Sequence, residues 1–250
     1  SKINVVYEHL GERKTLSLTR AEIKMKAVPY SGMLDAKTGY IALSSFTETS
    51  ANEVRTALQD LQKQGAEALV LDLRSNPGGL LTAAIEIVNL FVAKGTVVVR
   101  TKGQMTETDQ VFKTLREPIA AEMSVAVLID GQSASASEIV AGALQDLDRG
   151  AVVGQRSYGK GLVQQTRPLA YGAQLKLTVS KYYTPSGRCI QAFDYSDNAR
   201  GKRLDATKRT EFKTANGRKV FDGGGVDPDI LAGNGEISPV LYSLVRNGAL

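Results

Sequence analysis

Apolar positions along the chain follow two different periods, and the order of these periods predicts an α/β fold. Short continuous apolar runs have the length and the β-branched content of buried strands. They lie at 39–43, 68–73, 96–101, 125–129 and 151–154. Apolar residues recur at helical spacing between several of these runs, at 54–61, 80–92 and 139–147. Strands that alternate with helices in this way favour a largely parallel sheet with helices packed on it.

Outside this core the pattern changes. Residues 1–22 alternate around a turn at 10–13, which predicts a two-stranded hairpin. Because two strands alone are marginal in water, we expect the hairpin to be the end or the edge of a larger sheet. The remaining chain predicts strands at 163–166 and 173–183, a loop or hairpin at 102–118, an exposed insertion at 191–225 and a helix at 238–245.

Two signals predict where the helix at 54–61 begins and ends. Ser50 and Glu53 have the spacing of a capping box, in which the serine caps the helix and the glutamate reaches back to it. Gly65 follows the last apolar position and is expected to close the helix.

Composition narrows the possible functions. The chain has 250 residues, of which 42% are apolar, so it can bury a large core. It has no run of 18 apolar residues, and we expect no membrane insertion. No signal peptide is recognisable at the start, so we expect either a cytosolic protein or the mature form of an exported one. The single cysteine, Cys189, excludes an internal disulfide and a cysteine metal cluster.

The positive charge is concentrated in one segment. Residues 200–219 hold eight of the 31 Lys and Arg and two of the 26 Asp and Glu, so the remainder is nearly neutral at 23 against 24. A single basic loop is weak support for nucleic-acid binding, and we expect a solvated loop and no nucleic-acid partner.

Three serines, Ser133, Ser135 and Ser137, lie at the junction between a predicted strand and a predicted helix. The unpaired N–H groups of a helix start stabilise a developing negative charge, so a serine here could act as a nucleophile. It could equally cap the helix. His9 is the only histidine, so a serine nucleophile must use it or another base, and lysine is the usual substitute.

Lys160 is the strongest candidate for that base. Glycines flank it and apolar residues follow, and a lysine desolvated in such surroundings loses part of its preference for the charged form. Gln164 lies four residues on and could orient the amine. Both residues could also be ordinary surface residues of a loop and a strand.

The turn Asn76-Pro77-Gly78-Gly79 is a second candidate site between a strand and a helix. Its glycines permit close approach of backbone N–H groups to a substrate, as in an oxyanion hole or an anion site. They could instead serve only a turn that needs positive φ. The turn lacks the Gly-Lys-Ser/Thr ending of a nucleotide-binding P-loop.

A Ser-x-x-Lys string at Ser157 and Lys160 is a misleading match to the penicillin-binding enzymes. Those enzymes place both residues on one helix, whereas glycines flank Lys160 here. The strings Ser-Asp-Asn (196–198) and Lys-Thr-Gly (37–39) both occur in the chain, but no helix is expected to hold Ser157 and Lys160 together, so we reject this interpretation.

Taken together, the motifs resemble the carboxyl-terminal processing peptidases, a family of tail-specific Ser/Lys proteases. The matches occur in family order between about residues 22 and 231: Gly39-Tyr40-Ile41 with Phe46, 72–80, 133–139, Val153-Gly154 with 158–161 and 163–165, 183–188, and 227–229. The resemblance implies a ClpP/crotonase-like spiral ββα core with a β-rich C-terminal part.

The resemblance also assigns roles to individual residues. It implies that Ser135 is the nucleophile, Lys160 the general base and Gln164 a helper of the lysine. The backbone N–H groups of Gly79 and Ala136 would form the oxyanion hole. The implied reaction is peptide-bond hydrolysis through an acyl-enzyme, without a cofactor or a metal.

The chain departs from the family at its start, because members carry a PDZ domain before the core. Residues 1–22 resemble only the end of that domain, and residues 23–250 would be the catalytic core. The resemblance further implies export to the periplasm or cell envelope of a bacterium, and protein or peptide substrates with apolar C-terminal tails. The oligomeric state is left open.

Two other functions remain as alternatives. A catalytically silent scaffold could keep the fold, although it has no chemical need for the Ser135 and Lys160 pair. An acyl-CoA enzyme could use the same core, although such enzymes have no need for a Ser-Lys pair either.

Overall fold

A mixed six-stranded sheet forms the centre of the molecule. The structure, a computed structural model, describes residues 1–21, 25–103, 109–195 and 201–233. All neighbouring strands of this sheet are parallel except β3, which pairs antiparallel with β4. In spatial order the strands are β16 (Ile230–Leu231), β9 (Ala151–Gly154), β8 (Ser124–Ile129), β5 (Ala68–Asp72), β4 (Thr38–Ala42) and β3 (Tyr30–Met33). The α/β fold predicted from the alternation of strands and helices is therefore confirmed.

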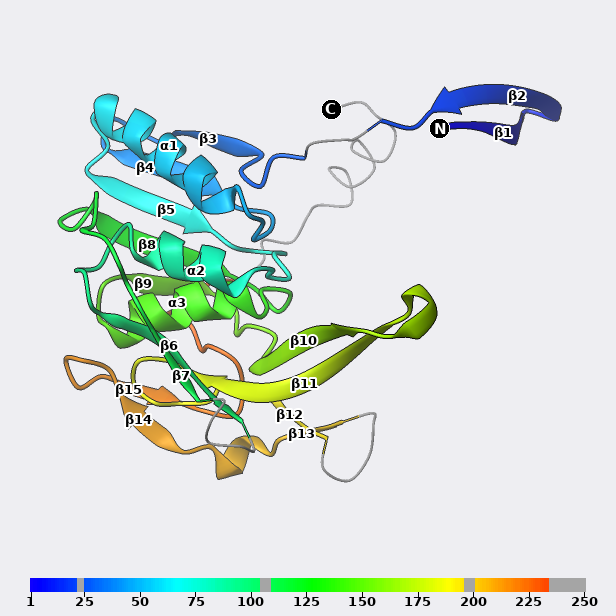
Figure 1. The fold of residues 1–250 in the computed structure, drawn as a ribbon. Coiled ribbons are helices and arrows are strands. Elements are labelled where there is room, and N and C mark those ends of the chain that lie inside the picture. Colours follow the sequence, from blue (N-terminus) through cyan, green and yellow to red (C-terminus); the bar gives the residue numbers. More distant parts are fainter. Residues whose placement is uncertain (22–24, 104–108, 196–200, 234–250) are drawn as a thin grey trace.

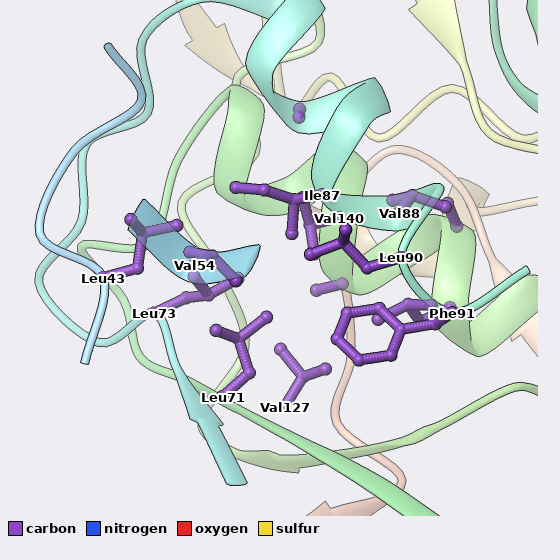
Figure 2. Close-up of a cluster of buried hydrophobic side chains, with 14 of the residues drawn as sticks. Leu43, Val54, Leu71, Leu73, Ile87, Val88, Leu90, Phe91, Val127 and Val140 are labelled. Atoms are coloured by element: carbon purple, nitrogen blue, oxygen red, sulfur yellow. The ribbon is translucent and has the colours of Figure 1, made fainter. Parts of the chain in front are cut away.

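Three helices lie side by side along this sheet (Figure 1): α1 (Ser50–Lys63), α2 (Leu81–Val88) and α3 (Ala136–Asp146). Each helix follows a strand of the sheet, so the start of each lies at the same edge as the carboxyl ends of β4, β5 and β8. The core is filled by aliphatic side chains from both layers. Figure 2 shows Val54 of α1, Ile87 of α2 and Val140 of α3 gathered around Leu71 and Val127 of the sheet.

The start of α1 differs from the sequence prediction. Ser50 is buried and lies inside the first turn, and its hydroxyl donates to the Thr47 carbonyl. The N-cap is Thr49, whose hydroxyl donates to Glu53. Glu53 also accepts the Val28 N–H, so its carboxylate bonds both to the N-cap side chain and to a neighbouring segment. At the other end the prediction is confirmed, since Gly65 follows the helix at φ +96°.

A second, four-stranded antiparallel sheet packs beside the core. Its strands in order are β10 (Leu162–Pro168), β11 (Gln174–Tyr183), β6 (Val97–Gly103) and β7 (Gln110–Lys113). Strand β7 pairs antiparallel with β6, so part of the segment 102–118 forms a hairpin, one of the two structures predicted for it. Strands β10 and β11 extend from the body as a two-stranded arm (Figure 1). Strand β10 is the edge strand of this sheet. The segment that precedes it in the chain leads from the core into the arm.

The segment 191–225 forms two small hairpins at the surface. They are β12 (Phe193–Asp194) with β13 (Lys202–Arg203), and β14 (Glu211–Lys213) with β15 (Lys219–Phe221). Arg218 reaches Asp148 and Asp229, and Arg209 pairs with Asp227. Two basic side chains of this segment are thus paired with acidic residues outside it.

The N-terminal hairpin predicted from the alternation is present. Strands β1 (Lys2–His9) and β2 (Glu12–Thr19) pair only with each other within the described residues, and every residue of both is exposed. The predicted helix at 238–245 lies outside the described residues. In the part of the chain that the structure describes, no helix has both the length and the apolarity needed to cross a membrane.

Candidate active site

The serine turn follows the carboxyl end of β8 and leads directly into α3. Ser135 is the N-cap of the helix and adopts φ +58°, ψ −112°. A non-glycine residue at positive φ is uncommon, and such strain is found mainly where function or packing fixes it. The helix begins at Ala136, one residue before the predicted start at Ser137. The Ser137 hydroxyl instead donates to the Asn76 carbonyl at 2.9 Å.

Asp130 holds this turn to its neighbour. Its carboxylate accepts the backbone N–H groups of Gln132, Ser133 and, across the sheet edge, Ser75. Burial alone would raise the pKa of Asp130, but these hydrogen bonds outweigh it and lower the pKa below its usual value. Asp130 is therefore held in its charged form at neutral pH, where it accepts donors from both turns.

The glycine turn at 76–79 packs directly against the serine turn. The Asn76 carbonyl accepts the Ala134 N–H at 3.0 Å, and the Asn76 side-chain amide donates to the Leu43 carbonyl at 2.7 Å. The Asn76 side-chain oxygen in turn accepts the Gly78 N–H at 2.9 Å. Asn76 is fully buried, so it joins β4, the glycine turn and the serine turn into one rigid unit.

Both glycines of this turn are required by the packing. Gly78 has φ +99°, and a Cβ there would lie 2.8 Å from both the Ser135 Cβ and the Ala136 nitrogen. Gly79 has φ +149°, and a Cβ there would lie 2.1 Å from the Phe46 carbonyl oxygen. The glycine turn therefore does need positive φ at both glycines, as one interpretation of the sequence proposed. It also packs too closely against the serine turn to admit a side chain at Gly78.

Two backbone N–H groups beside Ser135 lack an acceptor. Among the described residues, neither Ala136 N–H nor Gly79 N–H donates a hydrogen bond, whereas Gly78 N–H is occupied by Asn76. Ala136 is the first residue of α3, so its N–H carries the positive end of the helix dipole. These are the two donors that the family resemblance implies for an oxyanion hole.

Lys160 and Gln164 line one cavity with the residue that precedes Ser135. The cavity measures about 650 Å³ and is bordered by Pro77, Ala134, Lys160, Leu162 and Gln164, among others. The structure thus brings the serine turn, the glycine turn and the lysine loop to the same place. Within the described residues, no direct hydrogen bond joins the Ser135 hydroxyl to the Lys160 amine.

The far wall of the cavity is aromatic. Tyr158, Phe193 and Tyr195 line it, and their rings pack in series with centroid separations of 5.7 Å and 6.5 Å. Phe193 and Tyr195 come from the segment at 191–225, which the sequence did not connect with the site. Among the described residues that line the cavity, Lys160 is the only charged one.

Glu138 and Tyr182 are site residues that sequence reasoning missed. Glu138 lies in the first turn of α3 and is fully buried, and its carboxylate accepts the N–H groups of Ser135 and Lys160. Tyr182 of β11 is also buried, and its hydroxyl contacts the carbonyl oxygens of the same two residues. The capping-box spacing of Ser135 and Glu138 was a usable signal for the first contact.

The remaining candidates do not join the site. His9 lies on the exposed N-terminal hairpin. Burial is the main cause that raises the pKa of the Cys189 thiol, and a thiol with a raised pKa is less reactive. Residues 157–160 form a loop and not a helix, and the Ser157 hydroxyl donates to Glu138. Over the described ranges, no group of three or more His, Cys, Asp or Glu side chains is arranged to hold a metal ion.

Comparison with known proteins gives a consistent result. The family model described as "Peptidase family S41" matches residues 37–196. A carboxy-terminal-processing protease of Bartonella bacilliformis is 42% identical over 195 residues, covering 76% of this chain and 44% of the relative. A probable CtpA-like serine protease of Staphylococcus aureus is 34% identical over 232 residues, covering 92% of this chain and 45% of the relative.

Solved structures agree on the fold. The photosystem II D1 C-terminal processing protease aligns with a TM-score of 0.64 at 27% identity, over 98% of this chain and 59% of that one. An S41 protease described as putative, from Bacteroides fragilis, aligns with a TM-score of 0.63 at 16% identity, over 100% of this chain and 66% of that one. The chain spans less than half the length of the two curated relatives.

Proposed function

Because this chain belongs to peptidase family S41, as the order of its motifs predicted, we propose that it is the catalytic core of a serine endopeptidase. The proposed reaction cleaves proteins near their C-termini. The observation that carries the proposal is the meeting of three separate segments at one cavity: Lys160 and Gln164 line it beside Ala134, the neighbour of Ser135. The two unoccupied N–H groups next to Ser135 support the same chemistry.

In the proposed mechanism Ser135 is the nucleophile and Lys160 the general base. The neutral Lys160 amine takes the proton of the Ser135 hydroxyl as the oxygen bonds to the substrate carbonyl carbon. The N–H groups of Ala136 and Gly79 then donate to the oxyanion. The lysine returns the proton to the departing amine, and water hydrolyses the acyl-enzyme with Lys160 again as base. Gln164 is proposed to orient the Lys160 amine.

The chain without substrate has no direct hydrogen bond between the Ser135 hydroxyl and the Lys160 amine in its described residues. Catalytic hydrogen bonds are often long in free enzymes and shorten only when substrate binds. We therefore propose that binding of the substrate in the cavity completes the pair.

The walls of the cavity support a substrate with an apolar tail. Three aromatic rings line it, and Lys160 is the one charged residue in the part of its lining that the structure describes. Such a pocket favours burial of an uncharged side chain over that of a charged one. The relatives come from bacteria, and we propose that this protein acts on exported proteins in the periplasm or cell envelope.

The test compares Ser135→Ala and Lys160→Ala with the unchanged chain on an unfolded protein that ends in an apolar tail. Both variants are expected to lose cleavage, whereas Lys176→Ala on the exposed arm should retain it. Full activity of Ser135→Ala would refute the assignment of the nucleophile.

A second candidate function is a catalytically silent scaffold, which the missing Ser135–Lys160 hydrogen bond favours. An acylating serine-protease probe separates the two, because it forms an ester with a reactive serine. Mass spectrometry of the labelled chain should place the probe on Ser135. A complete failure to label, with and without an apolar peptide present, would support the scaffold.

A further inference from the structure

The buried carboxylate of Glu138 lies between the loops that carry the proposed nucleophile and base. One of its oxygens accepts the N–H groups of Ser135 and Lys160, both at 2.8 Å. The other accepts the Ser157 hydroxyl at 2.5 Å and the Gly159 N–H at 2.7 Å. A single side chain therefore fixes the backbone of two loops that are 25 residues apart in sequence.

Tyr182 contacts the same two residues from their carbonyl side. Its hydroxyl donates to the Lys160 carbonyl and lies 3.2 Å from the Ser135 carbonyl oxygen. Burial first, and the nearby charge of Glu138 second, raise the pKa of Tyr182 well above its usual value. The phenol thus keeps its proton and acts as a donor. Ser135 and Lys160 are thus each held at their own N–H and at their own C=O.

The burial of Glu138 is unfavourable for the free energy of folding. Glu138 is completely buried, and within the described residues it forms no ion pair. Burial of a carboxyl without a cation is strongly unfavourable unless hydrogen bonds compensate. Burial is the largest effect on the pKa of Glu138 and raises it above its usual value, although the four donors oppose this shift. If packing were the only role of position 138, an apolar residue there would avoid the free-energy penalty of burying a carboxyl group.

We infer that Glu138 and Tyr182 are positioning residues that together fix the separation and orientation of Ser135 and Lys160. The inference rests on the proposed function, because it assigns a role relative to that pair. Neither side chain lines the cavity, so they are expected to act through the backbone and not by contact with substrate. Displacement of a reacting group by about 1 Å can cost about 100-fold in rate, which gives such a clamp a large effect.

The experiment measures kcat, KM and the rate of Ser135 acylation by an active-site probe, for Tyr182→Phe and Glu138→Gln. Tyr182→Phe removes only the hydroxyl and keeps the buried ring. Two matched controls lie elsewhere: Tyr183→Phe removes the neighbouring hydroxyl on β11, and Glu53→Gln changes a carboxylate that accepts backbone N–H at α1. All rates are normalised to the folded fraction from urea unfolding curves.

Both site variants are expected to lower kcat and the acylation rate by at least about tenfold, with KM changed by less than about threefold. The two controls should match the unchanged chain. A residue that only stabilises the fold would change the folded fraction and not the rate per folded molecule.

Several outcomes would overturn the inference. One is an acylation rate of both variants within about twofold of that of the unchanged chain, while Ser135→Ala does not react. That result would refute the positioning role and leave the proposed function intact. Another is an effect on KM only, since this would indicate a substrate contact. If Glu138→Gln does not fold, Tyr182→Phe decides the result by the same limits. Reaction of Ser135→Ala at the normal rate would instead refute the proposed function itself.

Discussion

Substitution of Gly78 by alanine tests whether the glycine turn and the serine turn are packed as closely as the structure shows. Gly78 has φ +99°, and an added Cβ would lie 2.6 Å from the Ala134 carbonyl oxygen and 2.8 Å from the Ser135 Cβ. Ordinary contacts between such atoms are about 3.5–4.0 Å. The two turns must therefore separate by more than half an ångström to admit one methyl group.

Two effects of this substitution can be separated in magnitude. An alanine at positive φ costs about 1–2 kcal/mol of stability wherever it occurs. The steric displacement falls on Ser135 and on the Ala136 N–H, so it should lower kcat by about 10- to 100-fold, which is about 1.4–2.7 kcal/mol of activation free energy.

Gly95→Ala is the matched control, because Gly95 has φ +85° and no atom within 4 Å of an added Cβ. Urea unfolding should show a loss of stability for both variants, and peptidase assays should show a loss of kcat for Gly78→Ala alone. Equal kcat values for the two variants would refute the close packing of the turns. So would a loss for Gly78→Ala that appears only in KM.

Three further predictions follow from the buried charges. Because hydrogen bonds hold the pKa of Asp130 below its usual 3.8, its contribution to stability is present above that pH and is lost as the pH falls through the lowered value; urea unfolding of Asp130→Asn should show less acid sensitivity than the unchanged chain. The pKa of Glu138 is shifted upward from 4.5 by burial, so its effect has the opposite sign, and Glu138→Gln should lose less stability than the unchanged chain as the pH rises above 4.5. Arg188 and Asp146 form an ion pair at 2.8 Å with both side chains fully buried, and Arg188→Ala should cost about 3–5 kcal/mol in urea unfolding because it leaves the carboxylate unpaired; a cost below about 1 kcal/mol would contradict this reasoning.

The apolar periods predicted the three helices and four strands of the mixed sheet, β4, β5, β8 and β9, because each buried strand and each helix stripe has a distinct spacing. The run at 96–101 instead forms β6 of the second, antiparallel sheet. The family was predicted from short motifs in a fixed order, and the comparisons confirm it. Side-chain partners were harder to predict. Ser50 had the correct spacing for a cap, yet Thr49 is the N-cap. Glu53 bonds to Thr49 and also to Val28, a residue whose position no local pattern reveals.

The same limit applies to the site. Ser135, Lys160, Gln164 and the glycine turn carry recognisable motifs, whereas Tyr182 is one of two adjacent tyrosines at the end of an alternating strand. Its role arises from a long-range approach of β11 to the start of α3. Phe193 and Tyr195 lie in a segment without periodicity, and they reach the cavity only because that segment folds back onto the core.

The positive φ of Ser135 has a consequence for the life of the protein before it is folded. An isolated chain has no reason to hold a serine at φ +58°, because that conformation is unfavourable without the contacts of Asn76, Asp130 and Glu138. The Asn76 contact comes from the turn after β5, which meets the serine turn only when the sheet is complete. An incompletely folded chain therefore lacks this backbone geometry at the proposed nucleophile.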